Sequence, residues 1–170
     1  MTFVVGCDFE EFRHYYNDAI GKLGKDEGYW IEVDPSHLVV WRENGEIVGH
    51  AIWHESNTKE HKEGDPRDEQ DRRMLERLLG GEGDFVELHE VWLREDRRGK
   101  GYGERFFEFF EDFMEKRGHD SAVYYAYHPA AVAICRKRGY SEVSGLEARG
   151  LEGRMETMYI FHISPRGSPD

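Results

Sequence analysis

Between residues 84 and 118, a predicted strand, a glycine-rich basic loop and a predicted amphipathic helix follow one another directly. The strand is the apolar run from Asp84 to Leu93, and the helix has phenylalanines spaced along one face before Gly118 ends it. The glycine-rich loop between them is Arg98-Gly99-Lys100-Gly101-Tyr102-Gly103. This order strongly restricts the fold, because it predicts a βαβ unit within a mixed α and β domain.

The composition of the glycine-rich loop favours an anionic ligand. Its glycines let the main chain approach a ligand closely, and the free N–H groups of the next helix attract negative charge. Arg97, Arg98 and Lys100 add positive charge, so the segment predicts a diphosphate site. The loop fits neither the G-x-x-x-x-G-K-[ST] pattern nor the G-x-G-x-x-G pattern. On these residues alone, a basic turn without a ligand stays an alternative.

The rest of the chain predicts further strands and helices around this unit. Asp8 is a candidate cap for a helix that runs to about Leu23 and ends at Gly24, and Asn44-Gly45 indicates a hairpin turn. The other predicted elements are strands at 3–7, 38–41, 47–53 and 122–127, a short helix from His128 to Arg138, and closing strands at 140–146 and 155–163. We expect one domain over residues 1–163 and a flexible tail at 164–170.

Residues 56–83 differ sharply in composition from their surroundings. The part that ends at Arg73 is almost wholly polar and charged, and helical spacing predicts a helix from Asp68 to Leu79. We expect a mobile charged insertion that leads into this helix. A lid over a substrate and a solvated insertion are both open interpretations.

The net charge argues against two classes of partner. With 23 Lys and Arg against 35 Asp and Glu, the formal charge is −12, which disfavours nucleic acid and anionic membranes as partners. The same excess of acidic residues indicates either a soluble protein or a cationic amine substrate. The hydrophobic share of 38% excludes wholesale disorder.

The cysteines, histidines and apolar runs predict a cytoplasmic protein without a metal. Cys7 and Cys135 are far apart and too few for a disulfide framework, and the histidines show no H-E-x-x-H spacing. No apolar run reaches the roughly 20 residues that span a bilayer, and the N-terminus does not resemble a signal peptide. The sequence leaves monomer and homodimer open.

Two motifs make the chain similar to the GNAT superfamily of N-acetyltransferases. Arg98-x-x-Gly101-x-Gly103 follows the strand that ends in Val91-Trp92-Leu93, and it resembles the family's [Q/R]-x-x-G-x-[G/A] signature. The stretch from His128 to Tyr140 resembles the family's N-x-x-A-x-x-[FL]-Y-x-K-x-G-[FY] helix. The two matches cover residues 84–145, and the preceding helix and hairpin fit the family's order of elements.

The resemblance implies a fold and a cosubstrate. The implied fold is α/β (α+β), with a mixed, mostly antiparallel sheet of six to seven strands, about four helices, and a splayed strand pair where acetyl-CoA binds. Backbone groups of the strand would bind pantetheine and loop amides would bind pyrophosphate, with no room for a Cβ at Gly101 and Gly103. The implied contacts of coenzyme A are Val91, Trp92, Leu93, Arg98, Gly99, Lys100, Gly101, Tyr102, Gly103, His128 and Cys135.

The implied reaction is direct attack of a primary amine, in a small molecule or a protein, on acetyl-CoA in a ternary complex. An ammonium cannot attack, so a base must take its proton. Glu87 lies eleven residues before Arg98, where histone-modifying relatives carry a glutamate base. We expect burial to raise its pKa, although an exposed carboxylate is an equal alternative. His89 and Glu90 are rivals, and strand alternation places only His89 on the Glu87 face.

Two residues depart from the family pattern. His128 replaces an asparagine that often contacts pantetheine, and its imidazole can still donate a hydrogen bond. Cys135 replaces the tyrosine that often protonates the leaving thiolate. It is either that general acid or, as we prefer, a small buried side chain. Tyr125, Tyr127 or Tyr140 can then supply the proton.

These departures keep other functions open. A non-catalytic acyl-CoA-binding or sensor module is the main alternative, and a nucleotide-binding protein of another class is a third interpretation. The resemblance implies that residues 8–35 and 56–83 form the acceptor pocket, and their aromatic and acidic residues suit a cation. The sequence does not determine the acceptor, nor whether the acyl group is acetyl or longer.

Overall fold

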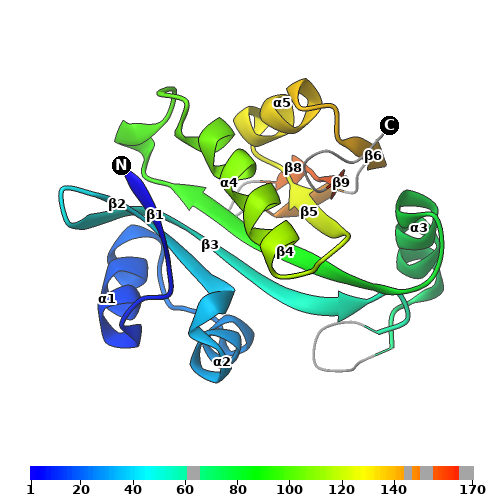
Figure 1. The fold of residues 1–170 in the computed structure, drawn as a ribbon, viewed down its shortest axis with the longest axis horizontal. Helices are drawn as coiled ribbons and strands as arrows, with labels where there is room; N and C mark the ends of the chain where they lie inside the picture. Colours follow the sequence, from blue (N-terminus) through cyan, green and yellow to red (C-terminus); the bar gives the residue numbers. More distant parts are fainter. Residues whose placement is uncertain (61–65, 144–146, 150–154, 165–170) are drawn as a thin grey trace. The chain divides into compact units, whose positions relative to one another are not determined.

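The structure, a computed structural model, describes residues 1–60, 66–143, 147–149 and 155–164 (Figure 1). The main sheet has seven strands in the order β1-β2-β3-β4-β5-β9-β6, and β7 (Glu147–Arg149) pairs separately with β8 (Met155–Thr157). This confirms the predicted mixed α/β fold, and the described residues contain five α-helices rather than about four. Contacts divide the chain into two units, which are Met1–His54 with His89–Phe106, and Glu55–Leu88 with Phe107–Asp170.

The first unit is built on three antiparallel strands. Thr2 of β1 lies opposite Arg42 of β2, and Leu38 of β2 lies opposite Ile52 of β3. The turn at Asn44-Gly45 joins β2 to β3, which confirms the predicted hairpin. The elements of this unit are β1 (Thr2–Val5), α1 (Phe9–Ala19), α2 (Lys25–Val33), β2 (Leu38–Glu43) and the first part of β3 (Glu46–Asn57).

Two helices pack on this hairpin where a single helix was predicted. Asp8 caps α1 as expected, because its carboxylate accepts the Glu11 N–H at 3.0 Å. However, α1 ends at Ala19, and Gly24 is the N-cap of α2 rather than the end of α1. The predicted end of the first helix was therefore wrong.

The second helix, α2, is stabilised mainly by its packing. Its sequence is a weak helical pattern, because Gly28 and several aromatic and β-branched residues lower the helix propensity. Trp30 and Ile31 are nevertheless buried in the core of the first unit. The members of this core are Phe12, Tyr16, Trp30, Ile31, Leu38, Val40, Ile47 and Ile52.

The second unit combines parallel and antiparallel strands. Its core includes Leu75 of α3, Phe85 of β4, Val123 of β5 and Ile160 of β9. The predicted closing strand at 140–146 is described only as β6, since residues 144–146 lie outside the described residues, as do 165–170 of the predicted tail. The elements not yet given are α3 (Glu69–Leu79), β4 (Asp84–Leu93), α4 (Tyr102–Lys116), β5 (Ala122–Ala126), α5 (Pro129–Lys137), β6 (Ser141–Val143) and β9 (Tyr159–Ile163).

Strand β4 leaves its parallel neighbour early. Val86 to Leu88 of β4 pair with Ala122 to Tyr124 of β5, whereas β4 itself continues to Leu93. The described pairing thus stops five residues before the end of β4, which agrees with the expected splayed pair. A 3₁₀ turn at Glu95–Arg97 joins this end of β4 to the glycine-rich loop.

The charged insertion is anchored at both of its ends by Arg67. The Arg67 side chain is fully buried and lies 2.8 Å from Asp71. It also donates hydrogen bonds to the Asn57 carbonyl at 2.9 Å and to the Ser56 hydroxyl at 2.9 Å. The predicted helix is confirmed as α3, with Asp68 as its N-cap. Residues 61–65 lie outside the described residues, and the lid stays a prediction.

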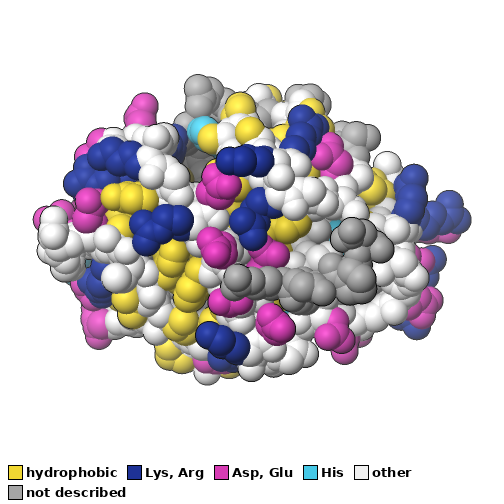
Figure 2. All heavy atoms as spheres, turned by 45° about the horizontal axis from the view of Figure 1, so that its top comes forward, with side chains coloured by type: hydrophobic (Ala, Val, Ile, Leu, Met, Phe, Trp, Pro, Cys, Tyr) yellow, Lys and Arg dark blue, Asp and Glu magenta, His cyan; other side chains and the backbone are white. Residues whose placement is uncertain are grey.

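The surface carries basic and acidic side chains side by side. Figure 2 shows Lys and Arg next to Asp and Glu over much of the visible face, without one large basic area. None of the helices in the described part of the chain is long and apolar enough to cross a membrane.

Candidate active site

The backbone of the glycine-rich loop adopts conformations that favour glycine. Gly99 and Gly101 have φ values of 77° and 83°, in the left-handed region that costs other residues free energy. A Cβ at either position would meet no atom of the protein within 4 Å. The main-chain conformation, rather than crowding by the protein, therefore requires glycine there. Helix α4 begins at Tyr102, so its free N–H groups lie within the loop.

The arginines beside the loop are partly engaged with the protein itself. Arg97 lies 2.5 Å from Glu43 and 3.1 Å from Asp96, and Arg97 holds the pKa of Glu43 below its usual range. Arg98 donates a hydrogen bond from Nε to the Leu93 carbonyl at 2.8 Å. Lys100 is exposed. An anion in the loop would therefore depend mainly on backbone N–H groups and Lys100, and less on Arg97 than the sequence suggested.

The end of β4 lies close to β3. The Arg94 N–H donates to the Val48 carbonyl at 2.8 Å. A Cβ on Gly49 would approach the Trp92 carbonyl oxygen to 2.8 Å, so only glycine allows this close contact. The Leu93 carbonyl accepts a hydrogen bond from Arg98. The remaining backbone groups of Val91 and Leu93 are therefore the candidate partners of pantetheine.

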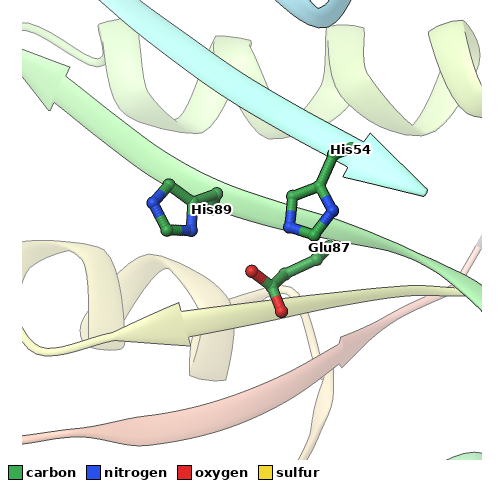
Figure 3. Close-up of side chains that lie close together, drawn as sticks. All are labelled: His54, Glu87 and His89. Atoms are coloured by element: carbon green, nitrogen blue, oxygen red, sulfur yellow. The ribbon is translucent and has the colours of Figure 1, made fainter. Parts of the chain in front are cut away.

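Glu87 is a buried carboxylate near the middle of β4. Its side chain is 6% exposed, so the alternative of an exposed carboxylate was wrong. Glu87 and His89 are two residues apart and project from the same face of the strand (Figure 3). His89 Nε2 lies 2.8 Å from the Glu27 carboxylate of α2.

An aromatic side chain adjoins these titratable groups in the first unit. The Trp30 ring stacks on the His54 ring, with centroids 3.9 Å apart and planes at 16°. Trp30 also lies edge-on to His89 at 5.0 Å. The two histidines come from β3 and β4 with ring centroids 6.0 Å apart. Sequence spacing gave no sign of this proximity, because the two residues lie on different strands.

Glu90 does not follow the predicted alternation. His50 and His54 are four residues apart on β3 and share one face. The ring of His54 lies beside His89, while His50 Nε2 lies 2.5 Å from Glu90. His89 and Glu90 therefore both reach the side of β3 that carries these histidines. These contacts do not agree with the prediction that Glu90 faces the opposite side from His89.

Helix α5 contains the two departures from the family pattern. His128 Nδ1 accepts the Ala130 N–H at 3.2 Å, so this imidazole caps the helix. Cys135 is fully buried, and burial raises the pKa of its thiol to about 12. Both features favour structural roles for these side chains. The Tyr140 hydroxyl donates to Glu111 at 3.0 Å, so it also has a partner within the second unit.

Tyr125 is the candidate tyrosine whose surroundings include the predicted base. Burial is the largest cause of the raised pKa of its hydroxyl, and the negative charges of Glu87 and Asp71 raise this pKa further. Arg67 lowers it. The hydroxyl therefore stays protonated across the neutral range. It is a donor rather than a base in this environment.

Sequence reasoning did not identify Glu27 or His54 as neighbours of His89. A predicted helix over the α2 residues would have grouped Glu27 with Trp30, because residues three apart share one face of a helix. No local signal points to His54, whose partners depend on strand pairing. The acceptor pocket at residues 8–35 and 56–83 stays a prediction.

The fold and the loop together define a class of protein. A glycine-rich loop that starts a helix, after a strand that leaves its parallel neighbour, is the architecture of an acyl-CoA-dependent N-acyltransferase. The model of the acetyltransferase (GNAT) family matches residues 6–140. The chain belongs to this family, and its cosubstrate is acetyl-CoA. No match to a curated protein was found.

Solved structures of N-acetyltransferases share this fold. A Drosophila melanogaster polyamine N-acetyltransferase has a TM-score of 0.66 at 11% identity, over 96% of this chain and 100% of that one. An Aedes aegypti arylalkylamine N-acetyltransferase has a TM-score of 0.65 at 13% identity, over 97% and 99%. A Salmonella typhimurium structure that includes acetyl-CoA has a TM-score of 0.61 at 18% identity, over 100% and 98%.

Proposed function

We propose that the protein transfers an acetyl group from acetyl-CoA to a primary amine, by direct attack in a ternary complex. The observation that carries this proposal is the buried Glu87, eleven residues before the first residue of the glycine-rich loop. A buried carboxylate is a stronger base than an exposed one, because burial disfavours its charged form. It suits the task of taking a proton from an ammonium group near neutral pH.

The reaction balances with groups of this chain. Glu87 takes one proton from the ammonium, and the free nitrogen attacks the thioester carbonyl carbon to form a tetrahedral intermediate. The C–S bond then breaks and the CoA thiolate leaves, while the amide forms. The thiolate takes a proton from a tyrosine, with Tyr125 as the first candidate, or from water. The thiol of Cys135 is fully buried, so we do not assign this proton transfer to it.

The acceptor in this proposal is a cationic amine. The carboxylate of Glu27 and the ring of Trp30, both from α2, each contact His89, and carboxylates and aromatic faces both attract cations. The structural neighbours include enzymes named for polyamines, agmatine and arylalkylamines. A small molecule and a peptide N-terminus are both acceptable forms of this amine. The cytoplasmic location and the oligomeric state stay predictions.

The test is release of free CoA thiol from acetyl-CoA in the presence of an amine panel. We expect Glu87→Gln to lower kcat about 100-fold while the affinity for CoA changes less than about twofold, because the loss concerns proton transfer. Glu108→Gln, an exposed carboxylate on α4, is the matched control and should keep wild-type turnover. Equal losses of kcat and CoA affinity in Glu87→Gln would reject the assignment of the base.

The alternative function is a non-catalytic acyl-CoA-binding or sensor module. The structural roles of His128 and Cys135 favour it, because two residues that act in relatives serve packing and capping here. It predicts tight binding of acetyl-CoA without turnover of any amine. A thermal-shift panel of CoA, ATP and NAD separates both functions from a nucleotide-binding protein, since a ligand of the native state raises Tm.

A further inference from the structure

Four polar side chains of the first unit form a hydrogen-bonded group that the proposed reaction does not use. The Tyr15 hydroxyl lies 2.9 Å from His50 Nδ1, and His50 Nε2 lies 2.5 Å from Glu90 Oε2. The Tyr16 hydroxyl donates to Glu90 Oε1 at 3.1 Å. We call Tyr15, Tyr16, His50 and Glu90 the buried polar network. It joins α1, β3 and β4.

Three members of the buried polar network are buried and Tyr15 is half-buried, and the polar groups bond to one another. His50 is 0% exposed, Tyr16 5% and Glu90 6%. A proton on His50 Nε2 gives each ring nitrogen and each carboxylate oxygen a partner, whereas a buried carboxylate without partners would destabilise the fold. Burial and the charge of Glu90 also raise the pKa of Tyr15, which keeps its hydroxyl as a donor. The orientation of each side chain is thus fixed by the others.

This arrangement makes Glu90 a poor candidate for the base. Both of its carboxylate oxygens already accept hydrogen bonds, from Tyr16 and from His50. A proton acceptor for the substrate needs an oxygen that can reach the substrate. The buried polar network also contacts Trp92, through His50 and Tyr15.

Trp92 lies between the buried polar network and the first residue of the glycine-rich loop. Its ring is 6.2 Å from the His50 ring with planes at 28°, and 6.3 Å from the ring of Tyr15. The guanidinium of Arg98 lies over the same tryptophan, 5.8 Å from the ring centroid. Arg98 Nε also donates to the Leu93 carbonyl at 2.8 Å. A continuous series of contacts therefore runs from Glu90 through His50 and Trp92 to Arg98.

We propose that the buried polar network positions the glycine-rich loop for the diphosphate of coenzyme A. By fixing the plane of Trp92, it fixes Arg98 and with it the start of the loop whose backbone N–H groups bind phosphate. Its effect is preorganisation, because a loop that is already ordered loses less conformational entropy on binding. His50 and Glu90 are positioning residues in this account. The inference rests on the proposed acyl-CoA site and names the part of CoA that the network serves.

The test compares two ligands that differ in the diphosphate. Dissociation constants of CoA and of pantetheine are measured by calorimetry for Glu90→Gln, Tyr15→Phe and Trp92→Leu. We expect each variant to weaken CoA binding about tenfold and to change pantetheine binding less than about twofold, since pantetheine lacks the groups that the loop binds. Tyr29→Phe, at a tyrosine that is 58% exposed on α2, is the control and should leave both constants unchanged.

Two results would overturn the proposal. One is equal weakening of both ligands, which indicates a general loss of structure or a role at the pantetheine arm. The other is unchanged CoA affinity in folded Glu90→Gln and Tyr15→Phe. Should Glu90→Gln fail to fold, Tyr15→Phe, which removes a single hydroxyl, decides. Turnover of the wild type is measured separately. CoA binding without turnover therefore rejects the proposed reaction and leaves the positioning role to be judged on affinity.

Discussion

Three neighbouring titratable residues of β4, Glu87, His89 and Glu90, compete for the role of base, and their surroundings separate them. His89 is already close to the Glu27 carboxylate. Both oxygens of Glu90 accept hydrogen bonds inside the buried polar network. Glu87 is buried and lies eleven residues before Arg98, the position on which its proposed role rests. In our proposal Glu87 takes the proton, and Glu90 positions the loop.

Cys135 provides a prediction at the same scale. We expect Cys135→Ala to keep kcat within about threefold of wild type, because a fully buried thiol does not deliver the proton to the leaving thiolate. The same change should lower the free energy of unfolding by about 1 kcal/mol, through the small cavity it creates. Steady-state kinetics and denaturant titration measure the two effects. A 100-fold loss of kcat would instead make Cys135 the general acid.

The thiol also makes stability depend on pH in a defined direction. Burial raises the pKa of Cys135 from 9.0 to about 12, so the unfolded chain loses this proton at a lower pH than the folded chain. The contribution is complete below pH 9 and is lost as pH rises toward 12. In denaturant titrations over this range, Cys135→Ala should lose less stability than wild type. Identical losses would contradict burial of the thiol.

At the scale of elements, local patterns predicted some features and missed others. The ends of β4 and α3 agree with prediction because apolar periodicity and capping residues such as Asp68 are local. Helix α2 was missed because Gly24 is its N-cap and it contains Gly28, so packing rather than propensity stabilises it. The pairing of His50 with Glu90 was also missed, since it depends on how two strands lie against each other.

The glycine-rich loop gives a prediction at this scale with a matched control. Gly101 and Gly118 have similar φ values of 83° and 79°, and a Cβ at either would meet no atom within 4 Å. Alanine at either position should lower the free energy of unfolding by about 1–2 kcal/mol. Only Gly101→Ala should also weaken CoA binding, by about tenfold, because its backbone belongs to the phosphate site. Calorimetry that finds equal CoA affinities for the two variants would argue against that site.

At the scale of the whole molecule, family membership defines the cosubstrate and leaves the acceptor to the individual chain. The glycine-rich loop and the early end of the β4–β5 pairing are the features that the family match over residues 6–140 explains. The acceptor depends on α2 and on the charged insertion, for which no family motif was available. An acidic chain with a net charge of −12 attracts cations over its surface, which agrees with the proposed amine.

The central claim is acetyl transfer to an amine, and mass spectrometry of the reaction products tests it most directly. Wild-type protein is incubated with acetyl-CoA and, in turn, a polyamine, an arylalkylamine and a peptide with a free N-terminus. We predict that at least one amine gains an acetyl group in an amount equal to the CoA released, and that Glu87→Gln but not Glu108→Gln slows formation of this product about 100-fold. Binding of acetyl-CoA with no acetylated amine from the whole panel would contradict the account.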